Sequence, residues 1–162
     1  MANKQPIELF MPPNMLKAKA GGGLGGVDIA AMKRAEMAMG ALKEEFADWL
    51  ADDVKKLSDA SIRYGRAPDA KSRGALLRAA HDIKGQAATF EFPLIARVAG
   101  SLSRLIGTLP ETSEVPMNLV DAHVNAVRVI HKLGLKDTGN EMALALCKEL
   151  DAKVDEVLAK AA

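Results

Sequence analysis

Apolar side chains recur every three to four residues along most of this 162-residue chain. That spacing lines one face of an α-helix, whereas a half-buried β-strand alternates apolar and polar residues. No stretch combines sustained alternation with the β-branched and aromatic residues that strands favour, so we expect no sheet. Amphipathic helices with short connections pack most simply as a bundle. The sequence therefore predicts an all-α protein: an antiparallel four-helix bundle with an additional N-terminal helical segment and a flexible N-terminal tail.

Capping residues and prolines mark where the predicted helices begin. Asp28 and Asp69 each precede a helical stretch, where a carboxylate accepts hydrogen bonds from the first free N–H groups. Pro93 marks the start of the next predicted helix, because proline is favoured in the first turn of a helix. Before the last helix, Thr138 and Glu141 have the spacing of a capping box.

The apolar stripes also predict which side chains form the core. Phe46 and Trp49 are the heaviest core candidates of the first helix, in which Gly40 marks a point where a break is expected. We expect both aromatic rings to serve packing. The predicted stripe of the last helix consists of Met142, Leu146, Leu150, Val154 and Val157.

The first 26 residues differ in composition from the rest of the chain. Residues 21–26 have the glycine-rich composition of a flexible linker, and three prolines before them disfavour a continuous helix. Apolar residues between positions 7 and 16 leave a second interpretation open, in which this segment docks on the domain or on a partner. We divide the chain into an N-terminal segment, 1–26, and a helical-bundle domain, 27–162.

Charge and cysteine content exclude several classes of function. The 22 basic and 21 acidic residues give a net charge of +1 without a basic block, so no nucleic-acid partner is implied. The single cysteine excludes an internal disulfide and is typical of a reducing compartment. No leader and no apolar run of membrane-spanning length is visible. We expect a cytoplasmic protein that contacts no membrane.

Two of the three histidines have spacings that disfavour a metal site. His123 lies on the inward face of its helix, where a partly buried, hydrogen-bonded imidazole is the expected state, and His131 lies near the edge of that face. Eight residues separate them, which is too far for one ion without a third ligand between. No Glu-x-x-His pair occurs, and the chain has few cysteines and histidines. We expect neither a metal nor a cofactor of its own.

His81 is the remaining candidate. On a helical wheel it lies roughly 140° from the apolar stripe of its helix. Lys84 and Gly85 follow it on the same face, and neighbouring positions carry small side chains. A glycine inside a helix costs about 1 kcal/mol relative to alanine, so we interpret Gly85 as keeping bulk away from the imidazole. An exposed histidine without any role is the alternative.

The surroundings of His81 limit the chemistry that it can perform. A position inside a helix offers no free N–H groups for an oxyanion, and no carboxylate cluster is present to hold the Mg²⁺ that phosphoryl transfer requires. Ser101 and Ser103 are not placed to form a hydrolase site with it, and a general-base role lacks a partner acid. The imidazole can still accept a phosphoryl group covalently if a partner supplies metal and electrostatics.

These residues resemble the signature of histidine-containing phosphotransfer (HPt) domains of two-component phosphorelays. The matching elements are His81, Lys84-Gly85, Ala87-Ala88 and the amphipathic segment that begins at Pro93. The resemblance covers roughly residues 28 to 160 and includes a helical bundle. It implies a phosphoryl carrier of a bacterial signalling system that is not an enzyme in its own right.

The resemblance also implies roles for individual residues. His81 would accept the phosphoryl group through Nε2, Lys84 would neutralise its charge, and Gly85 would give a partner access. The implied docking surface contains Leu77, Arg78, Gln86 and Ala88. The implied partners are a response-regulator receiver domain, which brings its own Mg²⁺, and a hybrid histidine kinase; the chain itself is expected to be a monomer.

Two positions depart from the family pattern. Gln86 stands where a small residue is common, and either hydrogen-bonds near the site or faces solvent. Glu91-Phe92 stands where many relatives have a glycine near the helix end. A second hypothesis assigns the same surface to a helical adaptor that binds a signalling partner without phosphorylation.

Overall fold

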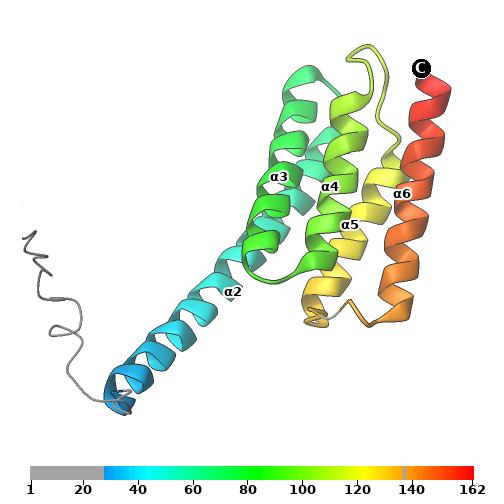
Figure 1. The fold of residues 1–162 in the computed structure, drawn as a ribbon. Helices are drawn as coiled ribbons and strands as arrows, with labels where there is room; N and C mark the ends of the chain where they lie inside the picture. The colour runs from blue at the N-terminus through cyan, green and yellow to red at the C-terminus, as the bar shows by residue number, and fades with distance from the viewer. Residues whose placement is uncertain (1–27, 137) are drawn as a thin grey trace, which may run out of the picture. The chain divides into compact units, whose positions relative to one another are not determined.

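The computed structural model describes residues 28–136 and 138–162, and this part of the chain consists of α-helices joined by turns and loops, with no strand. The helices are α2 (Ile29–Arg66), α3 (Ala70–Thr89), α4 (Pro93–Thr108), α5 (Met117–Lys132) and α6 (Glu141–Ala161) (Figure 1). The prediction of an all-α protein is confirmed. The predicted segment 1–26 lies outside the described residues.

Contacts within the chain cluster into two units, Met1–Ala41 and Leu42–Ala162, so the boundary falls inside α2. At the start of α2 the carboxylate of Asp28 accepts a hydrogen bond from the N–H of Ala30 at 3.0 Å. Asp28 is therefore placed to cap the helix as predicted. The expected break at Gly40 is wrong, because α2 continues through it.

Capping at α3 follows the prediction, whereas capping at α6 does not. Asp69 accepts from the N–H of Ser72 at 2.6 Å, and the Ser72 hydroxyl accepts from the N–H of Asp69 at 3.1 Å. The first of these bonds holds the pKa of Asp69 below its usual value. At α6 the cap is Asn140, whose side chain accepts from the N–H of Ala143 at 2.9 Å. The predicted Thr138–Glu141 box is wrong because Glu141 is the first helical residue, not the third.

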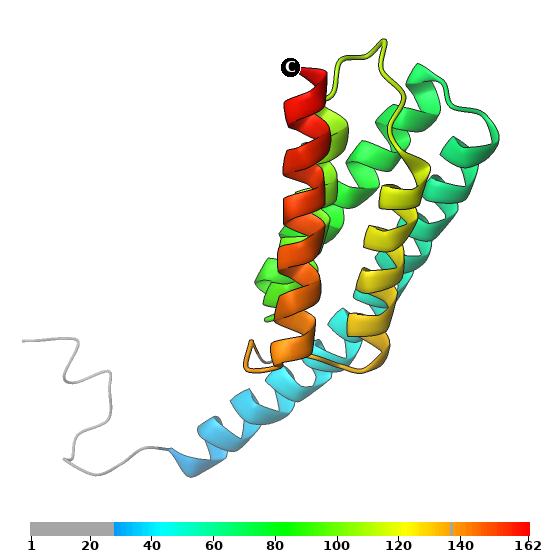
Figure 2. The same cartoon turned by 90° about the vertical axis from the view of Figure 1, so that its right-hand side faces the viewer.

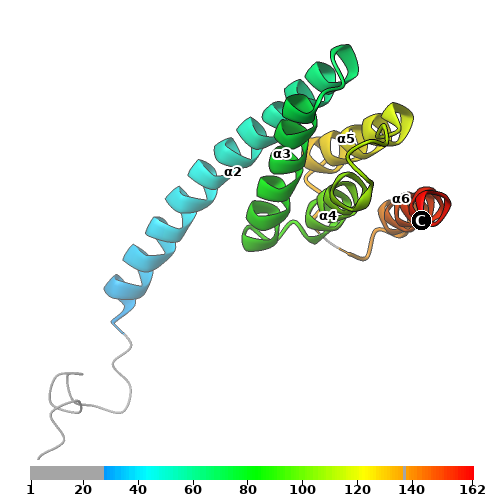
Figure 3. The ribbon, with the colours of Figure 1, turned by 90° about the horizontal axis from the view of Figure 1, so that it is seen from above.

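The core lies in the second unit, where α4 packs against α3, α5 and α6. Figures 2 and 3 show these helices side by side. The buried apolar side chains of α4 include Leu94, Ile95, Val98, Leu102, Leu105 and Ile106. Two ion pairs, Arg97–Asp151 at 2.8 Å and Arg104–Asp155 at 2.6 Å, also join α4 to α6. Since their side chains are part-exposed, each pair contributes at most about 1 kcal/mol.

The predicted aromatic core of α2 is wrong. Trp49 is 48% exposed and Phe46 is only half-buried. The Phe46 ring stacks on Phe90 with centroids 4.1 Å apart, and Trp49 meets the edge of Phe46 at 5.3 Å. Phe46 therefore covers the end of α3 and Trp49 packs against Phe46, whereas the buried α2 positions begin at Leu50.

The predicted stripe of α6 is correct at its C-terminal half only. Leu150 and Val154 are buried and Val157 is half-buried. Met142 is 84% exposed and Leu146 is 40% exposed, and the small residues Ala143 and Cys147 are buried in their place. The pattern gives most weight to large apolar side chains, whereas this end of α6 packs inward through small ones. Across the described residues, no helix is long and apolar enough to span a bilayer.

Candidate functional site

His81 lies near the middle of α3, on the side away from the core. The buried residues of this helix are Leu76, Ala80, Ile83 and Ala87, whereas the imidazole is exposed. The apolar stripe and the exposed position of His81 agree with the helical wheel. Its role as a phosphoacceptor stays a prediction.

Gly85, one turn after His81, has open space where a side chain would lie. A Cβ on this residue would meet no atom within 4 Å. Glycine in a helix interior costs about 1 kcal/mol relative to alanine, and packing within the described chain gives no reason for that cost. The bare backbone beside the imidazole favours close approach by a second molecule.

Two neighbours of His81 on α3, Leu77 and Lys84, lie against α4. A Cβ on Gly107 would be 3.8 Å from Cδ1 of Leu77, and a Cβ on Gly100 would be 3.5 Å from Cδ of Lys84. Leu77 and Lys84 are seven residues apart on α3, and their partners Gly107 and Gly100 are seven residues apart on α4. The partner of the earlier α3 residue is the later residue of α4. His81 therefore lies between two close contacts of α3 with α4. Among the described residues, Lys84 forms no ion pair.

The residues of the implied docking surface have different degrees of exposure. Arg78 and Ala88 are exposed, and Leu77 is half-buried. Gln86 is also half-buried, and its Oε1 is buried without a hydrogen-bond partner in the described chain. The sequence left two interpretations of Gln86 open, a hydrogen bond near the site or exposure to solvent. The side-chain carbonyl oxygen fits neither, because it is buried and accepts no hydrogen bond within the described chain.

The second departure, at Glu91, keeps the backbone conformation that glycine favours. Glu91 has φ = +62°, in the left-handed region. The N–H of Phe92 donates to the carbonyl of Ala87 at 2.8 Å, which is the long-range bond of a Schellman motif at the end of α3. Glu91 therefore completes this turn in a conformation that strains a residue with a side chain.

The other two histidines lie away from this surface. His123 is fully buried rather than partly buried as predicted. Its Nδ1 donates to the carbonyl of Leu119 at 2.7 Å, and its Nε2 is buried without a partner in the described residues. His131 is half-buried, with its ring 6.4 Å from that of Phe92. The described residues contain no group of three or more His, Cys, Asp or Glu side chains placed to hold a metal.

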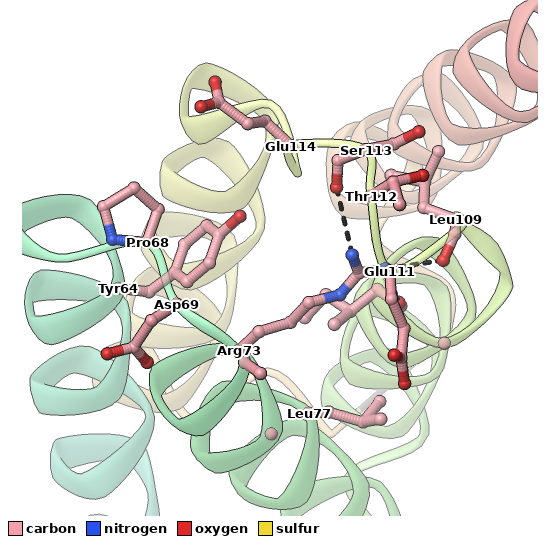
Figure 4. Close-up of a pocket in the computed structure, with 14 residues that line it drawn as sticks. Tyr64, Pro68, Asp69, Arg73, Leu77, Leu109, Glu111, Thr112, Ser113 and Glu114 are labelled. Atoms are coloured by element: carbon pink, nitrogen blue, oxygen red, sulfur yellow. Dashed lines mark hydrogen bonds between the residues drawn. The ribbon is translucent and has the colours of Figure 1, made fainter.

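Sequence reasoning missed Arg73, whose guanidinium binds the end of α4. It donates to the carbonyls of Ile106 at 2.8 Å and Leu109 at 2.6 Å, and to those of Pro110 at 2.8 Å and Ser113 at 3.0 Å. Figure 4 shows the side chain reaching the loop after α4. An isolated arginine gives no signal of this kind, because its partners are backbone atoms more than thirty residues away.

A pocket of about 410 Å³ surrounds Arg73 and adjoins the surface of His81 through Leu77 and Gly107 (Figure 4). Acidic side chains line it at Asp69, Glu111 and Glu114. Because the guanidinium already donates four hydrogen bonds to carbonyl oxygens, it has little capacity left for an anion. The pocket is therefore not suited to hold a phosphate.

Comparison with known protein families gives a match to the Hpt domain over residues 41–160. This segment is more than half of the chain and contains α3 with His81, Lys84 and Gly85. No curated protein and no solved structure matches the chain.

Proposed function

This chain belongs to the Hpt domain family, and we propose that it carries a phosphoryl group on His81 and exchanges it with the aspartate of a receiver domain. Hpt domains are phosphotransfer carriers of phosphorelay signalling, in which they interact with receiver domains and histidine kinases. The observation that supports the proposal most directly is the exposed imidazole of His81 beside the open backbone of Gly85.

The transfer is a displacement at phosphorus. Nε2 of neutral His81 attacks the phosphorus of the aspartyl phosphate, an N–P bond forms, and the P–O bond to the carboxylate breaks. The carboxylate leaves with the electron pair, and the remaining ring proton is on Nδ1. The return transfer reverses these steps. Lys84 lies one turn from His81 on the same face and neutralises part of the phosphoryl charge.

The receiver supplies what the surface of α3 lacks. We assign the Mg²⁺ used in phosphoryl transfer to the receiver, together with the acidic pocket that binds it. Leu77, Arg78 and Ala88 provide apolar and cationic contacts for docking, and Gln86 lies at the edge of the same surface. A hybrid histidine kinase is the proposed upstream source of phosphoryl groups.

Four further features of this proposal come from the sequence. They are the antiparallel arrangement of four helices, the division into a segment 1–26 and a domain 27–162, a monomeric state and a cytoplasmic location. The adaptor hypothesis remains the alternative, since an exposed helical surface can bind a partner without accepting a phosphoryl group.

The test is transfer of a radioactive phosphoryl group from phosphorylated receivers of the same genome. We expect a label that is acid-labile and base-stable, as a phosphohistidine is, and we expect its loss in His81→Gln. The matched control is His131→Gln, which changes a histidine outside α3 and should keep the label. Full labelling of His81→Gln would overturn the proposal. A variant without label that keeps both partner affinity and pathway output would favour the adaptor.

A further inference from the structure

The side chain of Lys84 lies along α4. A Cβ on Gly100 would be 3.5 Å from Cδ, 3.6 Å from Cε and 3.9 Å from Cγ of Lys84. Three consecutive methylene groups are therefore in van der Waals range of this position. An unrestrained lysine samples many rotamers, so packing of these three methylene groups against α4 restricts where the ammonium group can lie.

The direction of the Lys84 side chain makes this contact relevant to His81. Side chains of a helix lean toward its N-terminus and cover the preceding turn. The turn before Lys84 contains His81, three residues earlier on the same face. With its stem against α4, we expect Lys84 to place its ammonium group along the edge between α3 and α4, on the face that carries the imidazole.

Because Gly100 has no side chain, the Lys84 methylene groups can pack close to the backbone of α4 at this position. It is in the interior of α4, where glycine lowers helix stability relative to alanine. A single Cβ would still fit, since 3.5 Å is an ordinary contact distance. A longer side chain would need the volume that the lysine methylenes fill. Gly107, seven residues later, meets Leu77 in the same way at 3.8 Å.

We propose that Gly100 is a positioning residue for the phosphoryl site, which acts by seating the stem of Lys84 so that the ammonium group is held beside His81. This inference rests on the function proposed above. It assigns a role to a residue of α4, outside the His81-to-Gly85 stretch, and it predicts that changes at Gly100 act through Lys84.

The contact itself can be tested in the unmodified chain. Nuclear Overhauser spectra should show cross-peaks between the Hα protons of Gly100 and the methylene protons of Lys84. Their absence would overturn the inference, whatever the variants do.

The function is tested with phosphoramidate, a small phosphoryl donor that needs no docking partner. The variants are Gly100→Leu, Gly100→Ala, Lys84→Ala and the Lys84→Ala/Gly100→Leu pair, each checked for folding by circular dichroism. We expect Lys84→Ala to slow labelling of His81 roughly tenfold or more, because a charge-assisted contact to the phosphoryl group is lost. Gly100→Leu should weaken the same contact and slow labelling less, roughly three- to tenfold. Gly100→Ala should label at the parent rate. The double variant should match Lys84→Ala.

The outcomes separate this inference from the proposed function. An unlabelled His81 in the parent chain, with both phosphoramidate and receivers, overturns both. Normal labelling of Gly100→Leu overturns the positioning role alone, and so does a double variant that labels more slowly than Lys84→Ala. If Gly100→Leu does not fold, Gly100→Val replaces it under the same criteria.

Discussion

At the scale of the residue, Glu91 holds the least favourable backbone conformation of the described chain. Apart from glycine, it alone among the described residues has a positive φ. A left-handed conformation costs a residue with a side chain roughly 1–2 kcal/mol. Glu91 is exposed, and its backbone completes the turn that ends α3. We expect Glu91→Gly to raise the free energy of unfolding by about 1 kcal/mol, measured by urea denaturation.

The control for this prediction is Glu91→Ala, which removes the carboxylate and keeps the Cβ. If backbone strain is the cause, alanine gives little or no gain. An equal gain from alanine and glycine would show instead that the charge of Glu91 destabilises the chain.

The positions of His81 and Gly85 could be predicted from the sequence because both depend on one helix. A rotation of 100° per residue fixes their face relative to Ile83 and Ala87, whatever surrounds α3. Gly100 and the orphaned oxygen of Gln86 could not be predicted in this way. Their surroundings depend on how neighbouring elements pack against α3, which the periodicity of a single helix does not contain.

At the scale of the element, Arg73 joins the start of α3 to the end of α4. The last carbonyls of a helix lack partners within it, and Arg73 binds those of Ile106 and Leu109 together with two carbonyls of the following loop. We expect Arg73→Ala to lower the free energy of unfolding by about 2–4 kcal/mol, because several partly buried carbonyls lose a charged donor. Urea denaturation measures this loss.

Arg73→Lys is the matched variant for the shape of the guanidinium. An ammonium group keeps the charge but lacks the planar arrangement of donors that reaches four acceptors. We expect an intermediate loss of stability. A change of less than about 0.5 kcal/mol in Arg73→Ala, the range of ordinary surface substitutions, would contradict this account of the α3–α4 connection.

The error in the predicted stripe of α6 has its origin at this scale. Amphipathic periodicity identifies a helix and an approximate apolar side, but α6 presents two overlapping stripes that differ by one residue. The structure buries Ala143 and Cys147 and exposes Met142 and Leu146. Which stripe is buried depends on the packing of α6 against α4 and α5, so side-chain size alone gave the wrong answer.

At the scale of the whole molecule, the buried imidazole of His123 links protonation to folding. Burial lowers its pKa below the ordinary value of 6.5, although the Leu119 carbonyl and the charge of Asp151 oppose this shift. In the folded protein Nδ1 holds the proton and donates to Leu119, and Nε2 is unprotonated in the core. Protonation of Nε2 would create a buried cation whose new N–H group has no hydrogen-bond acceptor in the described chain.

The direction of the pH dependence follows from these two states. Below about pH 6.5 the unfolded chain binds a proton at His123 that the folded chain does not, so the free energy of unfolding falls on acidification. The loss begins near the unfolded pKa, has a slope of up to about 1.4 kcal/mol per pH unit, and ends at the lower folded pKa. Urea denaturation between pH 8 and about pH 5 measures it.

Replacing the titrating group isolates its contribution. His123→Leu has a side chain of similar size without a titrating group, and it should remove this part of the pH dependence. Its stability at neutral pH changes through packing and through the lost hydrogen bond from Nδ1 to the Leu119 carbonyl. His81→Gln is the matched control, because it replaces an exposed histidine outside the core. Carboxylates also titrate toward pH 5, so the comparison is between slopes of the three proteins. An unchanged slope in His123→Leu would show that the buried imidazole does not govern acid stability.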